Sequence, residues 1–345
     1  MLPSLKQTYK GKFLLGNIMA HEETEDGAVT KDFTYHYDIV TAQKAMKPAR
    51  LSLSRGNYDY ANADKIIEWA EKNGLLVHGH TLLWHGQHAD WLTSDGEGNA
   101  LNRAGAAANM ADYIKNAAGH FAGRCISWDV VNEGFSDSVE YTGDWRDGLR
   151  KESPWYIAYG GSGDYIYDAF KLARAHDPAA RLYYNDFNEQ EHGKSRAIAA
   201  MAIEMNGRWK ADAVYDGRML IEGIGMQAHY STETFDIAMF KDALALFIST
   251  GAVIAVSELD ITVGAEDPYP AHFLSKADER RQARMFGDIF QALSDAADHI
   301  ERVTFWGKRD DRSWRRGRLP LVFDWNGDAK EGFFSCINQN RERKL

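Results

Sequence analysis

The sequence predicts an α/β fold, a single (β/α)8 TIM barrel that spans residues 1–345. Short runs rich in β-branched and aromatic residues alternate with long amphipathic stretches, and the alternation repeats eight times along the chain. The length of 345 residues fits one large barrel or two medium domains, and a hydrophobic content of 44% supports a sizeable core. Because no linker rich in Pro, Gly or Ser interrupts the alternation, we expect one domain.

The strand candidates are short and evenly distributed. In chain order they cover residues 13–18, 37–42, 75–84, 124–132, 181–187, 221–230, 252–261 and 302–307. Helical patterns lie between them, for example over 62–74 and 239–251. These two patterns end at Gly74 and Gly251, and glycine is the residue that most often closes a helix in the left-handed conformation.

The composition excludes several classes of protein. A net charge of -10 argues against a nucleic-acid partner, because phosphates would be repelled overall. Only two cysteines are present, Cys125 and Cys336; one bridge is arithmetically possible, but we expect two buried thiols. No apolar run has the length of a signal peptide or a membrane span, so we expect a soluble protein. We also expect a monomer. Its cellular compartment stays open: the protein could be extracellular, with a leader removed, or cytoplasmic.

Acidic residues follow two of the strand candidates. Trp128 to Val131 form an apolar run that ends on Asn132 and Glu133, and the run at 252–261 ends with Glu258 and Asp260. Taken alone, Glu133 could simply mark where a strand reaches solvent. In a barrel, however, the chemistry lies at the carboxyl ends of the strands, so both glutamates would meet at one rim. Paired carboxylates are what cleavage of a glycosidic bond requires.

Other strand candidates end in polar or aromatic residues as well. Alternation along a strand puts His80 and Trp84 on one side of their strand, and likewise Gln227 and His229. Any one of these could be an ordinary core residue, and no HExxH or similar spacing indicates a metal. Their recurrence on at least six strand ends favours a binding site, to which two further strands contribute Asn185 and Trp306.

The combined motifs carry a family resemblance. The segments HGHTLLWHGQ, WDVVNE, YYNDFN, GIGMQAHY, VSELDI and TFWG, in this order and at these intervals, resemble glycoside hydrolase family 10, the endo-β-1,4-xylanases, over nearly the whole chain. The resemblance implies a retaining hydrolysis of xylan or xylo-oligosaccharides without a cofactor. Glu133 would be the general acid/base and Glu258 the nucleophile, with His229 as hydrogen-bond partner of Glu258 and Asp260 orienting His229. The residues that it implies for sugar binding are Lys47, His80, Trp84, Gln87, Asn132, Asn185, Gln227, Trp306 and Trp314.

The chain departs from the family pattern at one conspicuous place. Gln43 and Lys44 stand where the family usually has Glu-Asn next to the cleaved sugar on the glycone side, and Phe187 stands where it usually has tyrosine. The change makes that subsite more positive, and the loop at 308–318 is rich in arginine, which suits carboxylate recognition. The departure is either simple drift or a preference for xylo-oligosaccharides, acid-decorated xylan or another β-1,4-glycan. A separate alternative is a barrel that binds glycans without cutting them, against which the presence of Glu133, Glu258, His229 and Asp260 argues.

Overall fold

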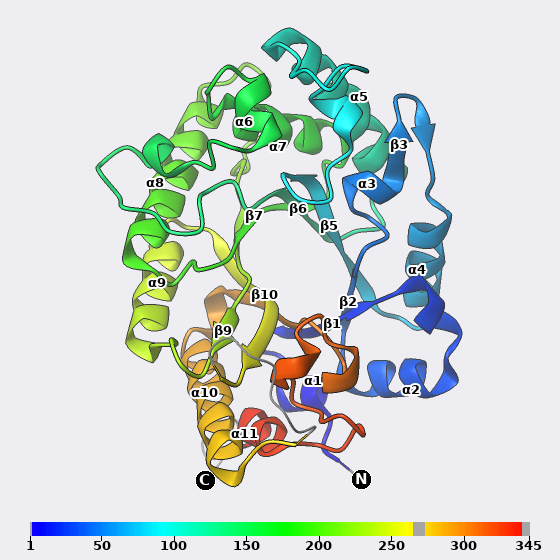
Figure 1. Ribbon diagram of the computed structural model, residues 1–345, viewed down its shortest axis with the longest axis vertical. Coiled ribbons are helices and arrows are strands. Elements are labelled where there is room, and N and C mark those ends of the chain that lie inside the picture. Colours follow the sequence, from blue (N-terminus) through cyan, green and yellow to red (C-terminus); the bar gives the residue numbers. More distant parts are fainter. Residues whose placement is uncertain (1, 265–272, 340–345) are drawn as a thin grey trace.

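The strand candidates assemble into one parallel sheet that closes on itself. A computed structural model describes residues 2–264 and 273–339. The strand order in the sheet is β11-β1-β2-β5-β6-β7-β8-β10, and β10 also pairs with β11, which closes the ring (Figure 1). Every pairing around the ring is parallel, so all the carboxyl ends meet at one rim. The predicted (β/α)8 barrel is confirmed.

The barrel strands match the predicted segments to within a few residues. They are β1 (Leu14–Met19), β2 (Ile39–Ala42), β5 (Leu76–Trp84), β6 (Ser127–Asn132), β7 (Arg181–Asp186), β8 (Gly223–Met226), β10 (Val253–Thr262) and β11 (Ile300–Phe305). The single strand predicted over 221–230 is wrong in one respect. It breaks after β8, because Ala228 adopts a left-handed φ of 58°, and resumes as β9 (His229–Ser231) beside the upper end of β10. A small antiparallel pair, β3 (Ser52–Ser54) and β4 (Asn57–Tyr58), lies outside the barrel.

Helices surround the sheet on its outer face (Figure 1). They are α1 (Leu5–Thr8), α2 (Gly27–His36), α3 (Pro48–Leu51), α4 (Ala61–Lys72), α5 (Arg103–His120), α6 (Pro154–Ala158), α7 (Asp164–His176), α8 (His192–Lys210), α9 (Ile237–Ser249), α10 (Lys276–Asp295) and α11 (Glu331–Asn338). Short 3-10 helices are η1 (His21–Glu25), η2 (Asp90–Leu92), η3 (Trp145–Gly148), η4 (Ala297–His299), η5 (Asp310–Arg312) and η6 (Arg316–Arg318). The chain reverses after α4 and α9 at Gly74 (φ 67°) and Gly251 (φ 85°), as predicted.

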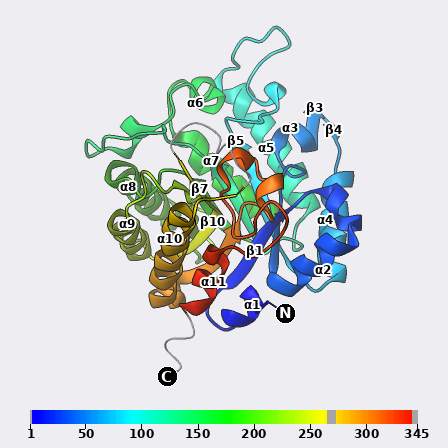
Figure 2. The same ribbon diagram turned by 60° about the horizontal axis from the view of Figure 1, so that its bottom comes forward.

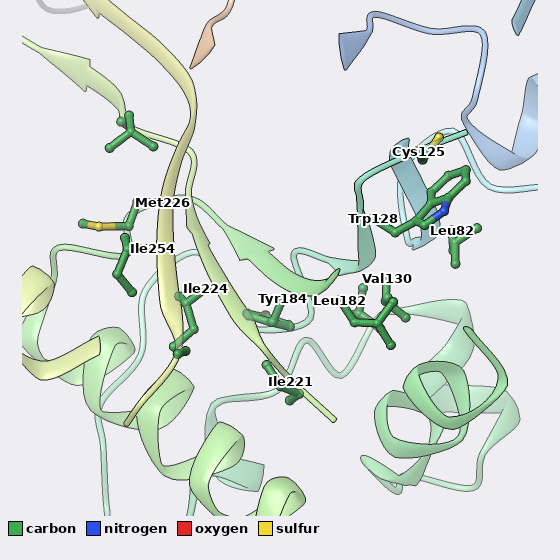
Figure 3. Packing of buried hydrophobic residues seen from close by; sticks show 14 of the residues in the cluster. Leu82, Cys125, Trp128, Val130, Leu182, Tyr184, Ile221, Ile224, Met226 and Ile254 are labelled. Atoms are coloured by element: carbon green, nitrogen blue, oxygen red, sulfur yellow. The ribbon is translucent and has the colours of Figure 1, made fainter. Parts of the chain in front are cut away.

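The apolar core lies mainly between the strands and the helices. One continuous cluster of buried side chains runs around the barrel, and Figure 3 shows part of it, including Trp128, Val130, Leu182, Tyr184, Ile224 and Met226. Glycines in the strands make room for large side chains of the neighbouring strand. A Cβ on Gly79 would lie 2.2 Å from the Trp128 ring, so only glycine fits beside this tryptophan.

The interior of the barrel is polar below the rim. The buried carboxylate of Asp129 lies 2.8 Å from His80 Nδ1 and 3.0 Å from His78 Nε2, and Arg302 donates to His78 at 2.9 Å. Burial alone would raise the pKa of Asp129, but the two histidines outweigh it and hold that pKa below its usual range. Such a paired network orients the inward side chains of several strands at once.

The helices near the two ends of the described chain lie next to each other. Figure 2 shows α1 and α11 next to each other, and the Tyr9 hydroxyl donates to the backbone oxygen of Cys336. Cys125 and Cys336 are both buried free thiols, as expected. Within the described ranges, no helix has the length and apolar character that a membrane crossing would require.

Candidate active site

A cavity of about 550 Å³ opens at the carboxyl ends of the strands. Thirteen of the fifteen residues singled out from the sequence line it, namely Gln43, Lys44, Lys47, His80, Trp84, Gln87, Asn132, Glu133, Gln227, His229, Glu258, Trp306 and Trp314. The other two, Asn185 and Asp260, are fully buried behind its wall and contact residues that line it. Residues from seven segments far apart in the sequence thus converge on one space.

Glu133 lies one residue beyond the end of β6. Its φ of 57° is left-handed, a conformation that costs a non-glycine residue free energy and that recurs at functional sites. The backbone N–H of Glu133 donates to the Asn185 carbonyl at 2.9 Å, which ties this turn to β7. The side chain accepts from Trp84 Nε1 at 2.6 Å, Gln227 Nε2 at 3.0 Å and Asn132 Nδ2 at 3.1 Å.

Burial raises the pKa of Glu133 above its ordinary value. The negative charges of Asp186 and Glu258 raise it further, while the hydrogen bonds from Gln227 and Trp84 act in the opposite direction. The net shift is upward, so the proton is retained to a higher pH than on an exposed glutamate. A carboxyl group in this state can act as a proton donor.

Glu258 lies on β10, and polar groups hold both of its oxygens. Asn185 Nδ2 donates to Oε1 at 2.9 Å, and His229 Nε2 donates to Oε2 at 3.2 Å. Burial alone would raise the pKa of Glu258, but the hydrogen bond from His229 and the nearby positive charges, including Lys47, outweigh it. The pKa of Glu258 is therefore lowered whereas that of Glu133 is raised, so the surroundings favour the ionised form of Glu258 and the protonated form of Glu133.

His229 connects Glu258 to Asp260. Its Nδ1 lies 3.1 Å from Asp260 Oδ1, an ion-pair contact, while Nε2 faces Glu258. Burial alone would lower the pKa of His229, but the two carboxylates raise it to about 10. The ring is thus an imidazolium at neutral pH, with a proton available for each carboxylate.

Three amides join the two glutamates into one network. Asn132 Oδ1 accepts from Asn185 Nδ2 at 2.9 Å and from Gln227 Nε2 at 3.1 Å. Since Asn185 also holds Glu258 and Gln227 also holds Glu133, displacement of any one amide would move both carboxyl groups.

Aromatic rings and cations form the remaining walls. Lys47 Nζ lies 4.7 Å from the centre of the Trp84 ring, and the His80 ring meets Trp306 edge-on at 5.3 Å. Trp314 is 62% exposed although it lines the cavity, so one side of its ring is available to a ligand. Flat apolar faces beside polar donors suit the two faces of a sugar ring.

Three residues near the site were missed in the sequence. Asn188 and Arg315 line the cavity, and His85 Nε2 lies 3.9 Å from Glu133 Oε2. The arginine-rich loop was a signal for Arg315, but neither spacing nor parity could place one particular arginine at the wall. Within the described ranges, no group of three or more His, Cys, Asp or Glu side chains is arranged to hold a metal ion.

Comparisons with known proteins agree on one family. The model of the family described as Glycosyl hydrolase family 10 matches residues 4–339. The endo-1,4-beta-xylanase A of Thermotoga maritima is 34% identical over 97% of this chain but only 31% of its own length, so the chain spans about a third of that relative. The beta-1,4-xylanase of Dictyoglomus thermophilum is 30% identical over 97% of this chain and 91% of its own length.

Solved structures agree with this assignment. A GH10 xylanase from termite gut that contains a bacterial Ig-like domain superposes with a TM-score of 0.91 at 33% identity, over 99% of this chain and 78% of its own. A psychrophilic family 10 endo-beta-1,4-xylanase gives 0.87 at 32% identity, over 97% of this chain and 99% of its own. The chain therefore belongs to glycosyl hydrolase family 10.

Proposed function

We propose that this chain is a retaining endo-β-1,4-xylanase, with Glu133 as general acid/base and Glu258 as nucleophile. The observation that carries the proposal is a pair of carboxyl groups on one cavity wall whose environments push their pKa values in opposite directions. Membership in the family and relatives described as xylanases support xylan as the substrate. The proposal treats residues 1–345 as one catalytic domain.

In the first step, Glu133 donates its proton to the glycosidic oxygen while Glu258 attacks the anomeric carbon. The aglycone leaves as an alcohol, and a covalent glycosyl-enzyme forms on Glu258. The hydrogen bonds from Asn185 and His229 hold Glu258 in place and favour its ionised form before the attack. Retention requires the two carboxyl groups to lie roughly 5 to 5.5 Å apart.

In the second step, Glu133 is ionised and takes a proton from water as the water attacks the anomeric carbon. The bond to Glu258 breaks, and the sugar is released with its original configuration. The donors from Gln227 and Trp84 stabilise the ionised form of Glu133 that this step needs.

The other residues that line the cavity would bind the sugar units. Trp84, Trp306 and Trp314 offer ring faces for stacking, and the amides and cations around them offer hydrogen bonds. The polar groups proposed for this role are Gln43, Lys44, Lys47, His80, Gln87, Asn132, Asn185 and Gln227.

Hydrolysis of unsubstituted β-1,4-xylan tests the proposal. Chromatography of the products is expected to give a ladder of xylo-oligosaccharides for the wild type and none for Glu258→Ala. Glu97→Ala, which removes an exposed carboxylate from a surface loop, is the matched control and retains the ladder. A wild type that leaves both xylan and an aryl xylobioside intact would instead favour a glycan-binding barrel.

A second candidate substrate is xylan that carries acidic side groups. Lys44 is exposed on the cavity wall, and its charge acts on Lys47, which in turn contacts Trp84. Two neighbouring ammonium groups on one wall favour a substrate with a carboxylate nearby.

Glucuronic acid-substituted and plain xylo-oligosaccharides of equal length separate the two substrates. We expect Lys44→Asn to reduce kcat/KM for the acidic oligosaccharide by up to about fivefold, the effect of one exposed charge pair in a low-salt buffer, and to leave the plain one unchanged. Equal kcat/KM values of the wild type for both oligosaccharides would exclude a preference for acid.

A further inference from the structure

The segment between β11 and α11 is fastened to the upper end of β10. The backbone N–H of Ile261 donates to the Pro320 carbonyl at 3.0 Å, and that of Val263 donates to the Arg318 carbonyl at 3.0 Å. In Figure 1 this segment is orange and lies beside β10. Because β10 also carries Glu258, the segment has a fixed position relative to that glutamate.

Two side chains of this segment reach the buried carboxylate of Asp260. Trp314 Nε1 donates to Oδ2 at 2.9 Å, and the Arg315 guanidinium donates from one terminal nitrogen to Oδ1 at 2.9 Å. Asp260 has no exposed surface, so these two donors and His229 replace water around it. Arg315 is partly exposed and also lines the cavity.

A continuous row of charged groups follows from these contacts. Arg315 contacts Asp260, Asp260 contacts His229 at 3.1 Å, and His229 contacts Glu258 at 3.2 Å. The charges alternate in sign along the row, positive, negative, positive, negative. Each member contacts the next, and both ends of the row, Arg315 and Glu258, line the cavity.

Other charged groups face this row from the surrounding elements. His80 of β5 and Lys47 act on Glu258 from the cavity side, and Glu258 in turn acts on Glu133 of the β6 end. Glu189, which follows β7, interacts electrostatically with His229. Among these groups, Arg315 is the cation that contacts Asp260 in addition to His229, and both lie against the same oxygen, Oδ1.

We propose that Arg315 is a positioning residue for the nucleophile, acting through Asp260 and His229 to keep Glu258 ionised and fixed. With Arg315 present, the negative charge of Asp260 is shared between two cations. Without it, Asp260 would draw the His229 proton and the ring toward itself, so that His229 would compensate the charge of Glu258 less. The role in catalysis rests on the proposed xylanase function, whereas the effect on Glu258 does not.

Arg315→Met tests this inference, with Arg316→Met as the matched control. Arg316 is the next residue along the chain and is exposed, so its replacement changes the net charge equally without touching Asp260. The midpoint of the Glu258 titration, followed by NMR of the ¹³C-labelled side-chain carboxyl, is expected to rise by about half to one pH unit in Arg315→Met. Arg316→Met is expected to keep the wild-type midpoint, and Arg315→Lys to restore most of the shift.

Kinetics supply a second readout. The acid limb of the kcat/KM profile on an aryl xylobioside should move upward by the same amount in Arg315→Met, while the alkaline limb stays in place. If Arg315→Met does not fold by circular dichroism, Arg315→Gln keeps a donor for Asp260 without the charge and gives the same titration test. Equal Glu258 midpoints in the Arg315 and Arg316 variants would overturn the inference. Wild type that is inactive on every xyloside would overturn the proposed function but leave the NMR result valid.

Discussion

Two chemically identical side chains acquire different acidities from their surroundings. Burial and negative neighbours raise the pKa of Glu133, whereas Glu258 faces His229 and Lys47, which lower its pKa despite burial. The activity of such a pair requires Glu258 to be ionised and Glu133 to be protonated. A bell-shaped pH profile of kcat/KM follows, with Glu258 setting the acid limb and Glu133 the alkaline limb.

Gln227→Met is expected to move the alkaline limb of this profile. The substitution keeps the side-chain size but removes the hydrogen bond from Gln227 Nε2 to Glu133 Oε1, which favours the ionised form. Loss of that donor raises the pKa of Glu133, so the alkaline limb shifts upward by about half to one pH unit. Gln43→Met, on the same wall but donating to neither glutamate, is the control; a limb that moves equally in both variants would contradict the assignment.

At the scale of the elements, turns and close strand contacts place the groups proposed for catalysis. The left-handed residues Glu133 and Ala228 lie just beyond the ends of β6 and β8. Glu133 itself lines the cavity, and so does His229, which follows Ala228. Gly225 of β8 lies against Asn185 of β7, the amide that holds Glu258. A Cβ on Gly225 would approach the Asn185 side-chain oxygen to 2.2 Å. The strand packing therefore leaves no room for a larger residue next to this amide.

Gly225→Ala is expected to damage activity more than stability. The added methyl group must push Asn185 away from Glu258 and Asn132, and a displacement of about 1 Å can reduce the rate by roughly 100-fold. Gly207→Ala in α8 is the matched control, because no atom lies within 4 Å of its Cβ position. That control should gain about 0.5 to 1 kcal/mol in free energy of unfolding and retain its kcat/KM. A fully active Gly225→Ala would contradict the placement of Asn185.

At the scale of the molecule, buried charges make stability depend on pH. Glu189 has no exposed surface; it accepts from the Tyr230 hydroxyl at 2.5 Å, and its other oxygen has no hydrogen-bond partner. Burial raises the pKa of Glu189 to about 7. The folded protein therefore holds this proton more tightly than the unfolded chain, and the stability falls as the pH rises from about 4.5, the ordinary value, toward 7.

Glu189→Gln is expected to remove this pH dependence. At pH 8 the ionised Glu189 of the wild type reduces the free energy of unfolding by up to about 3 kcal/mol, and glutamine carries no such charge. The variant should thus be more stable than the wild type at pH 8 and differ from it by less than about 1 kcal/mol at pH 5. Urea unfolding at the two pH values measures the difference; a gain that is equal at both would show that the charge of Glu189 is not its cause.

The sequence by itself determined the fold class and the residues of the candidate site. The strand and helix periods repeat strongly enough to predict the barrel, and a barrel brings all strand ends to one rim. The places of Glu133 and Glu258 near that rim follow from the ends of two strand candidates, and the remaining site residues were implied by the family resemblance. Local pattern was sufficient here because alternation within a strand is a local property.

Other features of the site depend on the tertiary structure and cannot be predicted from the alternation of residues along a strand. The break between β8 and β9 depends on one left-handed residue, Ala228, which no composition signal marks. The contact of Arg315 with Asp260 joins residues 55 positions apart through an irregular segment that has no period to count. The opposite pKa shifts of Glu133 and Glu258 depend on burial and on charges from several strands. Each pKa shift is the sum of burial, hydrogen bonds and charges from residues that become neighbours only when the barrel closes.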